Sequence, residues 1–505
     1  WEFGDDQRTI TYALREGVTW SDGEPFTSAD VEFTLRLVLD EPIYNWLGEV
    51  DWIDTIETPD PLTVVITSKE PSIKALNMNC PILPEHVWST VPKKDLLTYE
   101  SFPMVTTGPF VVTEAERKKL VRMVRNDTYW GKKPAIDEAW WLIYTSSDSM
   151  VQDYKLGKTS VVSEPELAQV KSLIGREGTS VSTGPGFSWV GISLNCSDEG
   201  ARKGDPLADR RVRLAIRQAI DAEKMVSTTF GDFGAQAAGV VSPVTPEWYW
   251  QIADDERLPF DPQAAQSLLD EAGYADPDGD GVRETPDGAP LSIQLTGSSA
   301  YTYEASWMKM AAASLKDVGF DATVQVLEEN TKWEKAYAGE LDAWGGGFYG
   351  TPDPDFVLQA YTTAQIGAFN DAGWSDPEYD ELYAQQKRLL DPGQRKPVVD
   401  ACQKKLYEES PVIPIMYLPA FSAYDTANWT DWLPAPPRTG SVTENYVDAF
   451  VLSNVRPATE AVVEDGGLSG GAIAGIVAGA VVVVGAVALL VARGMSRRRR
   501  SEEES

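Results

Sequence analysis

The fold is decided by the stretch 291–327, which reads LSIQLTGSSAYTYEASWMKMAAASLKDVGFDATVQVL. Residues 291–295 alternate apolar and polar side chains, as a strand does. Residues 305–318 carry apolar side chains at helical spacing, and Gly319 ends that helix. Residues 322–327 form a second strand. A strand, a helix and a strand in this order predict a βαβ unit with a right-handed crossover.

The loop between the first of these strands and its helix, residues 296–303, is a candidate for ligand binding. Ligands in open α/β sheets bind beyond the carboxyl ends of the strands. Two more helices are predicted upstream, over 209–220 and from 261 to 273, the second with Pro at its start and Gly at its end. This portion of the chain is therefore predicted to be an α/β lobe.

The first part of the chain has a different character. Short apolar strands are expected at 62–66, 110–113 and 140–144, separated by turns rather than regularly by helices, which predicts a mixed α+β lobe. A helix begins after Thr27, whose hydroxyl caps it. Because 505 residues exceed one ordinary core, two lobes are expected. We assign residues 1–188 to the first lobe, 189–430 to the second, and 431–455 to a return into the first.

The C-terminal tail predicts a membrane anchor. Residues 472–492 are uncharged and long enough to cross a hydrocarbon core of ~30 Å, and the basic run 493–500 follows them. Basic flanks stay on the cytoplasmic side. Residues 456–471 are then an acidic, Gly- and Ser-rich stalk, 472–492 a transmembrane helix, and 493–505 a cytoplasmic tail, with the body of the protein outside the cell.

Composition excludes several classes of function. The chain has 77 Asp and Glu against 44 Lys and Arg, a formal net charge of −33, so it repels nucleic acid. Its three cysteines are widely spaced and form no CxxC pair, and His86 is the sole histidine. No P-loop, GxSxG or Rossmann motif occurs. The chain is predicted to be no enzyme and to need no cofactor for its chemistry.

Motifs spread along the body carry a resemblance to a known family. The most diagnostic stretch is Tyr12-Ala-Leu-Arg-Glu-Gly-Val18, followed by Trp20-Ser-Asp-Gly-Glu-Pro-Phe-Thr27. Further motifs occur in the family's order at Ile82–His86, Thr107–Phe110, Asn126–Trp130, Asp209–Arg213, Pro352–Asp355 and Pro411–Pro414. With these residues the chain resembles the family 5 extracellular solute-binding proteins of ABC importers, from residue 1 to about residue 455.

The resemblance implies a fold and a function. It implies a two-lobed clam of the periplasmic-binding-protein type, with hinge strands, that closes on a small solute and presents it to the permease subunits of an ABC transporter. An oligopeptide or dipeptide is the expected solute. An oligosaccharide or a metal chelate, which other members bind, remains an alternative, as does a membrane-tethered sensor ectodomain. The importer is preferred to the sensor because residues 501–505 offer no cytoplasmic signalling domain.

Two departures from the family stand out. The family's first several dozen residues are missing from this sequence, and a C-terminal anchor replaces the usual N-terminal lipid, as in archaeal members.

Alignment on Asp353-Pro354 places Gly350 where peptide-binding relatives have an Asp that pairs with the ligand's amino terminus. Either another acid serves that role, or the ligand has no free amine.

The segment 343–355, which follows a predicted strand, interleaves aromatic residues with glycines that permit close approach of a ligand. The opposite interpretation is that its side chains pack in the core or cap the next turn. The residues that we predict to contact the ligand are Trp344, Phe348, Tyr349, Asp353, Trp189, Ser298 and Tyr301.

An acidic loop is a weaker candidate, for a structural Ca²⁺. Asp276, Asp278, Asp280 and Asp287 stand at the first, third, fifth and twelfth positions of an EF-hand-like spacing. No helix pair flanks them, and Asp replaces the usual final Glu, so a solvated acidic turn is the favoured interpretation. Separately, three Asn-X-Ser/Thr sequons begin at Asn126, Asn195 and Asn428, as an exported surface permits.

Overall fold

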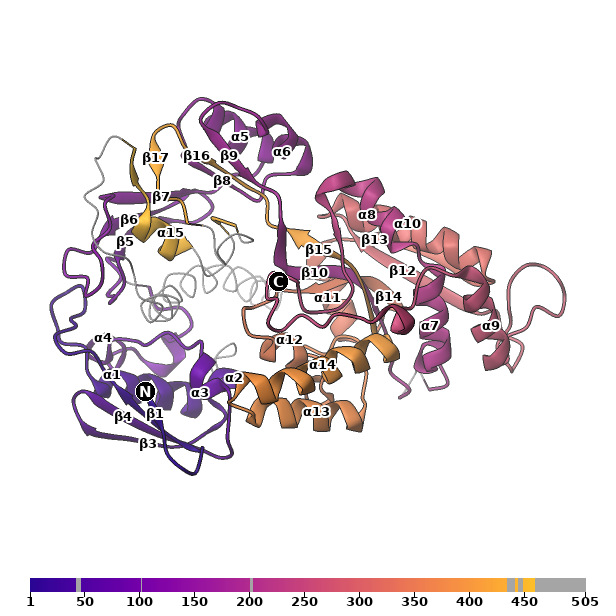
Figure 1. Ribbon diagram of the computed structural model, residues 1–505, viewed down its shortest axis with the longest axis horizontal. Coiled ribbons are helices and arrows are strands. Elements are labelled where there is room, and N and C mark those ends of the chain that lie inside the picture. The colour runs from indigo at the N-terminus through magenta and orange to yellow at the C-terminus, as the bar shows by residue number, and fades with distance from the viewer. Residues whose placement is uncertain (42–46, 101, 200–202, 434–440, 444–447, 459–505) are drawn as a thin grey trace. The chain divides into compact units, whose positions relative to one another are not determined.

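The computed structural model describes residues 1–41, 47–100, 102–199, 203–433, 441–443 and 448–458. The chain divides into two compact units (Figure 1). The first comprises Trp1–Thr183 together with the chain from Ala420 onward, and the second comprises Gly184–Pro419. The chain thus crosses between the units twice.

These boundaries differ from the predicted ones at 188 and 430. Strand β10 (Pro185–Leu194) already belongs to the sheet of the second unit. Strand β16 (Ser422–Asp425) pairs with β8 and β9 of the first unit, so the return occurs before residue 422. The sequence showed where strands occur but not which sheet each one joins.

The first unit is built from small antiparallel sheets, as the turn-separated strands predicted. A four-stranded sheet has the order β1-β2-β4-β3, and three-stranded sheets have the orders β5-β6-β7 and β8-β16-β9. Its elements are β1 (Glu2–Phe3), β2 (Thr9–Ala13), α1 (Ser28–Asp40), α2 (Leu47–Val50), β3 (Ile53–Asp60), β4 (Thr63–Ser68), α3 (Lys74–Asn77), α4 (Glu85–Trp88), β5 (Phe110–Glu116), β6 (Leu120–Arg125), β7 (Glu138–Leu142), α5 (Ser147–Lys155), β8 (Val161–Ser163), α6 (Leu167–Leu173), β9 (Thr179–Ser182), β16, β17 (Trp429–Thr430), α15 (Asp448–Asn454) and β18 (Arg456–Pro457).

Local chemistry explains where α1 begins. The Thr27 side chain accepts a hydrogen bond from the backbone N–H of Asp30, the third residue of the helix, and the Asp30 carboxylate accepts one from the backbone N–H of Thr27 at 2.9 Å; together these bonds form a capping box. Val31, Leu35 and Val38 on one face of the helix are buried against β2, β3 and β4. The capped helix and its sheet thus share one core.

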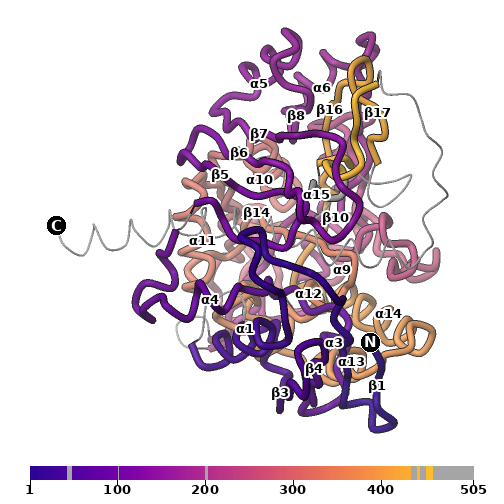
Figure 2. Tube along the Cα trace, turned by 90° about the vertical axis from the view of Figure 1, so that its left-hand side faces the viewer, coloured from indigo at the N-terminus to yellow at the C-terminus, as the bar shows by residue number. Residues whose placement is uncertain are grey.

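Helices α5 and α6 lie beside the β8-β16-β9 sheet (Figures 1 and 2). Strand β16 of this sheet is distant in sequence from both helices. Val151, Val162, Leu173 and Ala423 form the buried cluster between them. The end of the described chain also belongs to this unit, because β18 pairs with β17. Residues 456–458, which the sequence analysis assigned to the stalk, are therefore part of this unit.

The second unit contains one six-stranded sheet with the order β11-β15-β10-β14-β12-β13. Strands β12, β13 and β14 are parallel, while β10 runs antiparallel to both β14 and β15. Its elements are β10, α7 (Arg210–Ala219), α8 (Ala222–Thr229), β11 (Ala235–Gln236), α9 (Pro262–Ala272), β12 (Ser292–Ser298), α10 (Thr302–Asp317), β13 (Asp321–Leu327), α11 (Glu329–Tyr337), β14 (Ala343–Phe348), α12 (Asp355–Gln359), α13 (Pro377–Arg388), α14 (Pro392–Glu409) and β15 (Val412–Pro419).

The predicted βαβ unit is present. Strands β12 and β13 pair in parallel from Ser292↔Asp321 to Ser298↔Leu327, and α10 joins them. Trp307, Met308 and Leu315 on the inner side of α10 are fully buried. The α9 boundaries also agree with prediction, because Asp261 caps the helix and Gly273 ends it with a φ of +89°. The mixed α/β class expected from the sequence is confirmed.

Within the described residues, no helix has the length and apolar character needed to cross a bilayer. The predicted transmembrane helix at 472–492, the tail at 493–505 and the stalk after residue 458 lie outside the residues that the structure describes.

Candidate ligand-binding site

The candidate site lies where β12 and β14 of the second unit end. Ser298 is the last residue of β12 and Phe348 the last of β14, and the two strands belong to one parallel set. The polypeptide leaves these strands through the loops 299–301 and 349–354. Both loops thus stand at the carboxyl edge of the sheet, the position expected for a ligand.

Five aromatic residues meet at this edge, and we call them the aromatic face: Tyr301, Tyr303, Phe348, Tyr349 and Phe369. Tyr349 is 68% exposed, Phe369 44% and Tyr301 41%. The rings of Tyr301 and Tyr303 are 5.6 Å apart, and those of Phe348 and Phe369 are 6.4 Å apart.

The two halves of the aromatic face are close to each other. Burial raises the pKa of Tyr303 well above its usual value, and the phenols of Tyr301 and Tyr349 add to that effect. Tyr349 therefore lies close to Tyr303, although the two residues are 46 positions apart in the sequence, with most of α10 and all of β13, α11 and β14 between them. Three of the predicted ligand residues, Phe348, Tyr349 and Tyr301, are brought together here.

Three other predicted residues are core residues in this structure. Trp344, Trp189 and Ser298 each have 0% exposed surface. Trp344 Nε1 donates a hydrogen bond to Asp371 Oδ2 at 3.2 Å, and Ser298 Oγ accepts one from the Ala300 backbone N–H at 3.0 Å. They present no side-chain surface to a ligand, because the stretches of β10, β12 and β14 that carry them are buried.

Asp353 is held by a partner within the protein. Arg395 donates to both of its carboxylate oxygens, at 2.6 and 2.7 Å, and the Arg395 side chain is 1% exposed. Arg395 also donates to Gln386 Oε1 at 2.9 Å and lies over the ring of Trp248. Asp353 therefore pins the loop after β14 onto α14. Nothing in the spacing of the sequence joins residues 353 and 395.

A buried ion pair supports the same edge and was not foreseen. Lys332 Nζ lies 2.9 Å from Glu304 Oε2 and 3.1 Å from Glu329 Oε2, and it donates to the Gly345 carbonyl at 2.8 Å. Glu304 Oε2 also accepts from the Ser298 backbone N–H at 3.0 Å. Burial raises the pKa of Glu304, and Lys332 opposes that rise. The pair ties β12, β14, α10 and α11 together.

The glycines of β14 serve the protein's own packing. A methyl group on Gly345 would meet the Glu304 carboxylate at 2.4 Å, one on Gly346 the Ser193 hydroxyl at 2.3 Å, and one on Gly347 the Trp189 carbonyl at 2.3 Å. The prediction that these glycines leave room for a ligand is wrong for the strand, because neighbouring atoms already fill that room.

Gly350 is constrained in the same way. A methyl group there would lie 2.0 Å from the backbone carbonyl oxygen of Phe187, so no side chain fits at this position with the backbone as it stands. The position at which the resemblance implies an acid in peptide-binding members is therefore closed to one here.

Asp371 is a second buried carboxyl of this region with a raised pKa. It is 7% exposed, and burial raises its pKa from 3.8 to about 6, against the hydrogen bond from Trp344. It stands in the segment between α12 and α13, far in sequence from β14. Only the folded chain brings it under Trp344.

The acidic loop is assembled differently from the prediction. Ligand-capable oxygens of Asp276, Asp278, Asp280 and Glu284 lie within 4.8 Å of one another. Asp287 is not among them, since it accepts a hydrogen bond from Thr285 instead. Burial first, and then the three aspartates, raise the pKa of Glu284. Asp276, Asp278 and Asp280 also accept backbone N–H groups of their own loop, which is how a solvated acidic turn is stabilised.

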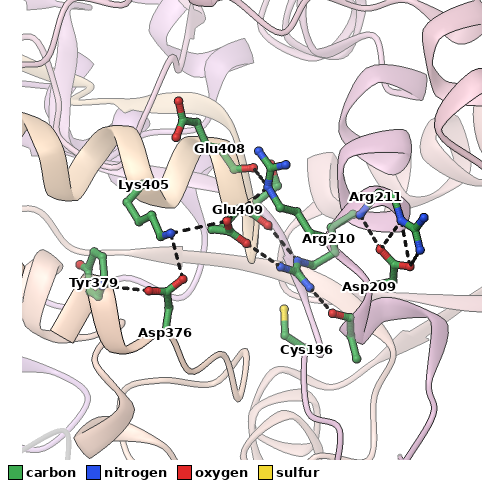
Figure 3. Close-up of polar contacts among 12 residues, drawn as sticks. Cys196, Asp209, Arg210, Arg211, Asp376, Tyr379, Lys405, Glu408 and Glu409 are labelled. Carbon is green, nitrogen blue, oxygen red and sulfur yellow. Dashed lines mark hydrogen bonds and ion pairs between the residues drawn. The ribbon is translucent and has the colours of Figure 1, made fainter. Parts of the chain in front are cut away.

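A second group of charges joins α7 to α14 (Figure 3). Glu409 accepts from Arg210 at 3.2 Å and from Arg213 at 3.3 Å, and Lys405 lies 3.1 Å from Asp376. Glu409 precedes β15, which runs in the same direction as β14 because both are antiparallel to β10. These ion pairs are therefore at the amino edge of the sheet, opposite the aromatic face, and hold helices to the scaffold.

The fold and the site define a binding protein of α/β type with an aromatic face at the carboxyl edge of its larger sheet. Comparison with known proteins gives its family. The profile of the bacterial extracellular solute-binding proteins, family 5 (middle), matches residues 1–369. The chain belongs to this family, and its relatives are binding proteins rather than enzymes, so it is not an enzyme.

Individual relatives agree with this assignment. Protein XP55 of Streptomyces lividans is 31% identical over 417 residues, 80% of this chain and 72% of that protein. A dipeptide-binding protein of Pseudomonas aeruginosa is 26% identical over 446 residues, covering 83% of this chain and 80% of that protein.

Solved structures share the fold. A periplasmic oligopeptide-binding protein of Thermotoga maritima superposes with a TM-score of 0.78 at 21% identity, covering 90% of this chain and 89% of that one. The same Thermotoga protein, solved with bound mannohexaose, superposes with a TM-score of 0.73 at 21% identity, covering 90% of this chain and 89% of that one.

Proposed function

We propose that the chain is the extracytoplasmic solute-binding component of an ABC importer and that its solute is a peptide. The observation that carries the proposal is the aromatic face at the carboxyl edge of the β12–β14 sheet. A group of exposed aromatic rings is unfavourable in water and often marks a binding site. Such rings stack against a ligand and make apolar contacts with it. Relatives that bind dipeptides and oligopeptides support a peptide as the solute.

The charges around the aromatic face limit which groups of the peptide the site can bind. Asp353 is neutralised by Arg395, and Glu304 by Lys332. Gly350 leaves no room for an acid. An ammonium group buried without a carboxylate partner is costly. The peptide is therefore recognised through its backbone and side chains, with its amino terminus held elsewhere or left in solvent.

Capture is proposed to proceed by closure of the two units on the ligand. The chain crosses between them at 183–184 and at 419–420, and we propose that these two connections act as the hinge. A ligand that contacts both units stabilises the closed state, which the permease then recognises. Small-angle scattering of the protein with and without a verified ligand measures the compaction, and an unchanged radius of gyration would contradict closure.

Isothermal titration tests the recognition step with a tripeptide and its N-acetylated form, chosen from a thermal-shift screen. Equal affinity for the two forms is expected. A Tyr349→Ala variant should weaken both, while Tyr337→Ala serves as the matched control, because Tyr337 is 45% exposed on the same unit but lies at the end of α11. Binding that Tyr349→Ala leaves intact would remove the aromatic face from the proposal.

An oligosaccharide is the second candidate. The aromatic face suits stacking against sugar rings, and the absence of an acid at Gly350 removes a contact that only amines need. The structural relative from Thermotoga binds mannohexaose. Stabilisation by oligosaccharides and by no peptide in the same thermal-shift screen would move the protein into this branch.

A further inference from the structure

The three Asn-X-Ser/Thr sequons of the chain differ in the environment of their asparagine. They are Asn126-Asp127-Thr128, Asn195-Cys196-Ser197 and Asn428-Trp429-Thr430. Attachment of a sugar to such a sequon requires that the asparagine Nδ2 reach a transferase and carry a bulky group into solvent. Burial and existing hydrogen bonds therefore decide which of them is a modification site.

Asn126 is a structural residue. It is 4% exposed, and its Nδ2 donates to the Gly108 carbonyl at 2.9 Å. Its Oδ1 accepts from the Thr128 backbone N–H at 3.1 Å and from the Thr128 hydroxyl at 2.8 Å. The threonine of the sequon thus serves to organise the turn after β6, and a sugar on Asn126 would have to break that turn.

Asn195 is buried more deeply still. It is 1% exposed, and its Nδ2 donates both hydrogens, to the Gly339 carbonyl at 3.1 Å and to the Leu341 carbonyl at 2.9 Å. These bonds connect the end of β10 with the chain that leads into β14. Substitution of an amide hydrogen by a sugar would remove one of them and leave a buried carbonyl without its donor.

Asn428 has the opposite environment. It is exposed, as are Thr426 and Ala427 beside it in the turn that joins β16 to β17. Its described side-chain contact is one hydrogen bond, from Nδ2 to Asp425 Oδ2 at 2.7 Å. Strands β16 and β17, toward the yellow end of the colour bar, run in the first unit (Figure 2). A turn at the surface accommodates a large substituent without disturbing a ladder.

We propose that Asn428 carries an N-linked glycan and that Asn126 and Asn195 do not. The family is extracellular, so this turn lies outside the cytoplasm. The sugar donor belongs to the class of lipid-linked oligosaccharide phosphates. Asn428 Nδ2 forms a bond to the anomeric carbon, the bond from that carbon to the phosphate oxygen breaks, the lipid phosphate leaves with the electron pair, and the amide proton passes to a base. The proposal does not depend on which solute the protein binds.

Mass spectrometry of proteolytic peptides tests the proposal on the full chain isolated from the cells that make it. The peptide containing Asn428 is expected to be heavier by at least one sugar residue, and the peptides containing Asn126 and Asn195 are expected at their unmodified masses. In the same cells, Asn428→Gln keeps an amide at the position and Thr430→Val keeps the asparagine. Both variants should lose the sugar and still fold, because Asn428 is exposed and because valine, which is β-branched like threonine, suits strand β17.

The outcomes separate cleanly. An unmodified Asn428 in the protein from its native cells overturns the proposal, and so does a sugar on Asn126 or Asn195 alone. A mass increase that persists in Thr430→Val also overturns it, because attachment through a sequon requires the hydroxyl residue two positions later. Unchanged thermal unfolding of Asn428→Gln shows that the loss of sugar does not arise from misfolding.

Discussion

Strand β14 and the loop that follows it share a composition rich in glycine and aromatic residues, yet they serve different purposes. In the strand, Trp344 is fully buried, and neighbouring atoms occupy the space that a side chain would take at glycines 345–347. In the loop, Tyr349 is 68% exposed. The difference comes from position, because β14 is central in a six-stranded sheet whereas its carboxyl end opens to solvent. An aromatic residue near a binding edge is therefore informative only once its exposure is known.

The largest expected effect on stability comes from a substitution of the buried residue in this comparison, Trp344. Trp344→Ala removes a fully buried indole and should lower the free energy of unfolding by about 4 kcal/mol. Urea denaturation followed by circular dichroism measures the loss. Ligand affinity of the fraction that remains folded should change little, and a selective loss of affinity with normal stability would instead make Trp344 a ligand residue.

The ion pair behind the loop gives the next effect. Asp353→Asn leaves the Arg395 guanidinium buried without a carboxylate and should cost about 3 kcal/mol of unfolding free energy. The matched control is Glu138→Gln, which breaks the Arg122–Glu138 pair of similar two-pronged geometry at an exposed site. The control should unfold at nearly the wild-type urea concentration. Equal losses in the two variants would contradict the role given to burial.

The pH dependence of Asp371 gives a smaller effect. Its pKa of about 6 in the folded protein lies above its ordinary value of 3.8, so the folded state binds a proton more readily than the unfolded chain. Its contribution to stability is therefore greatest at low pH and is lost as the pH rises to about 6, in total about 3 kcal/mol and about half of that between pH 5 and pH 7.5.

The comparison of wild type with Asp371→Asn isolates this contribution from the many surface carboxylates. Urea unfolding of both proteins at pH 5 and at pH 7.5 should show the wild type losing stability relative to the variant as the pH rises. A constant difference between the two proteins would show that Asp371 does not titrate in this range.

The smallest effect on stability is expected for the exposed residue of the comparison, Tyr349. Tyr349→Ala should change the free energy of unfolding by less than about 0.5 kcal/mol, because the ring is mostly in solvent. Its effect on ligand affinity should be about tenfold, which corresponds to about 1.4 kcal/mol of lost ring contact. Titration calorimetry measures it, and Tyr349→Phe should retain most of the affinity. A large loss of stability in Tyr349→Ala would place this ring in the core.

Much of the fold was predictable because its signals are local. The strand, helix and strand of 291–327, the cap at Thr27 and the Asp261-to-Gly273 helix depend on side-chain periodicity and on the chemistry of helix ends. The boundaries of the two units were predicted less well. Whether β16 joins one sheet or the other depends on partners that lie 240 to 263 residues away, at β8 and β9.

The site was predictable only in part. The loop after β12 and the segment around β14 were identified from their place in an α/β pattern, and Tyr301, Phe348 and Tyr349 do meet there. The partners that decide the state of each residue come from elsewhere: Arg395 for Asp353, Lys332 for Glu304, Asp371 for Trp344 and the Phe187 carbonyl for Gly350. No periodicity links these positions.

The sequence by itself determined the acidic character of the protein, its mixed α/β class and, through motifs in order along the chain, its place among solute-binding proteins. These properties depend on composition, on short-range spacing and on residues close in sequence. Only the tertiary structure decided which aromatic rings are packing and which are surface, which acids are already paired, and which asparagine is open to modification. Burial and pairing are produced by contacts between distant segments, and such contacts exist only after the chain has folded.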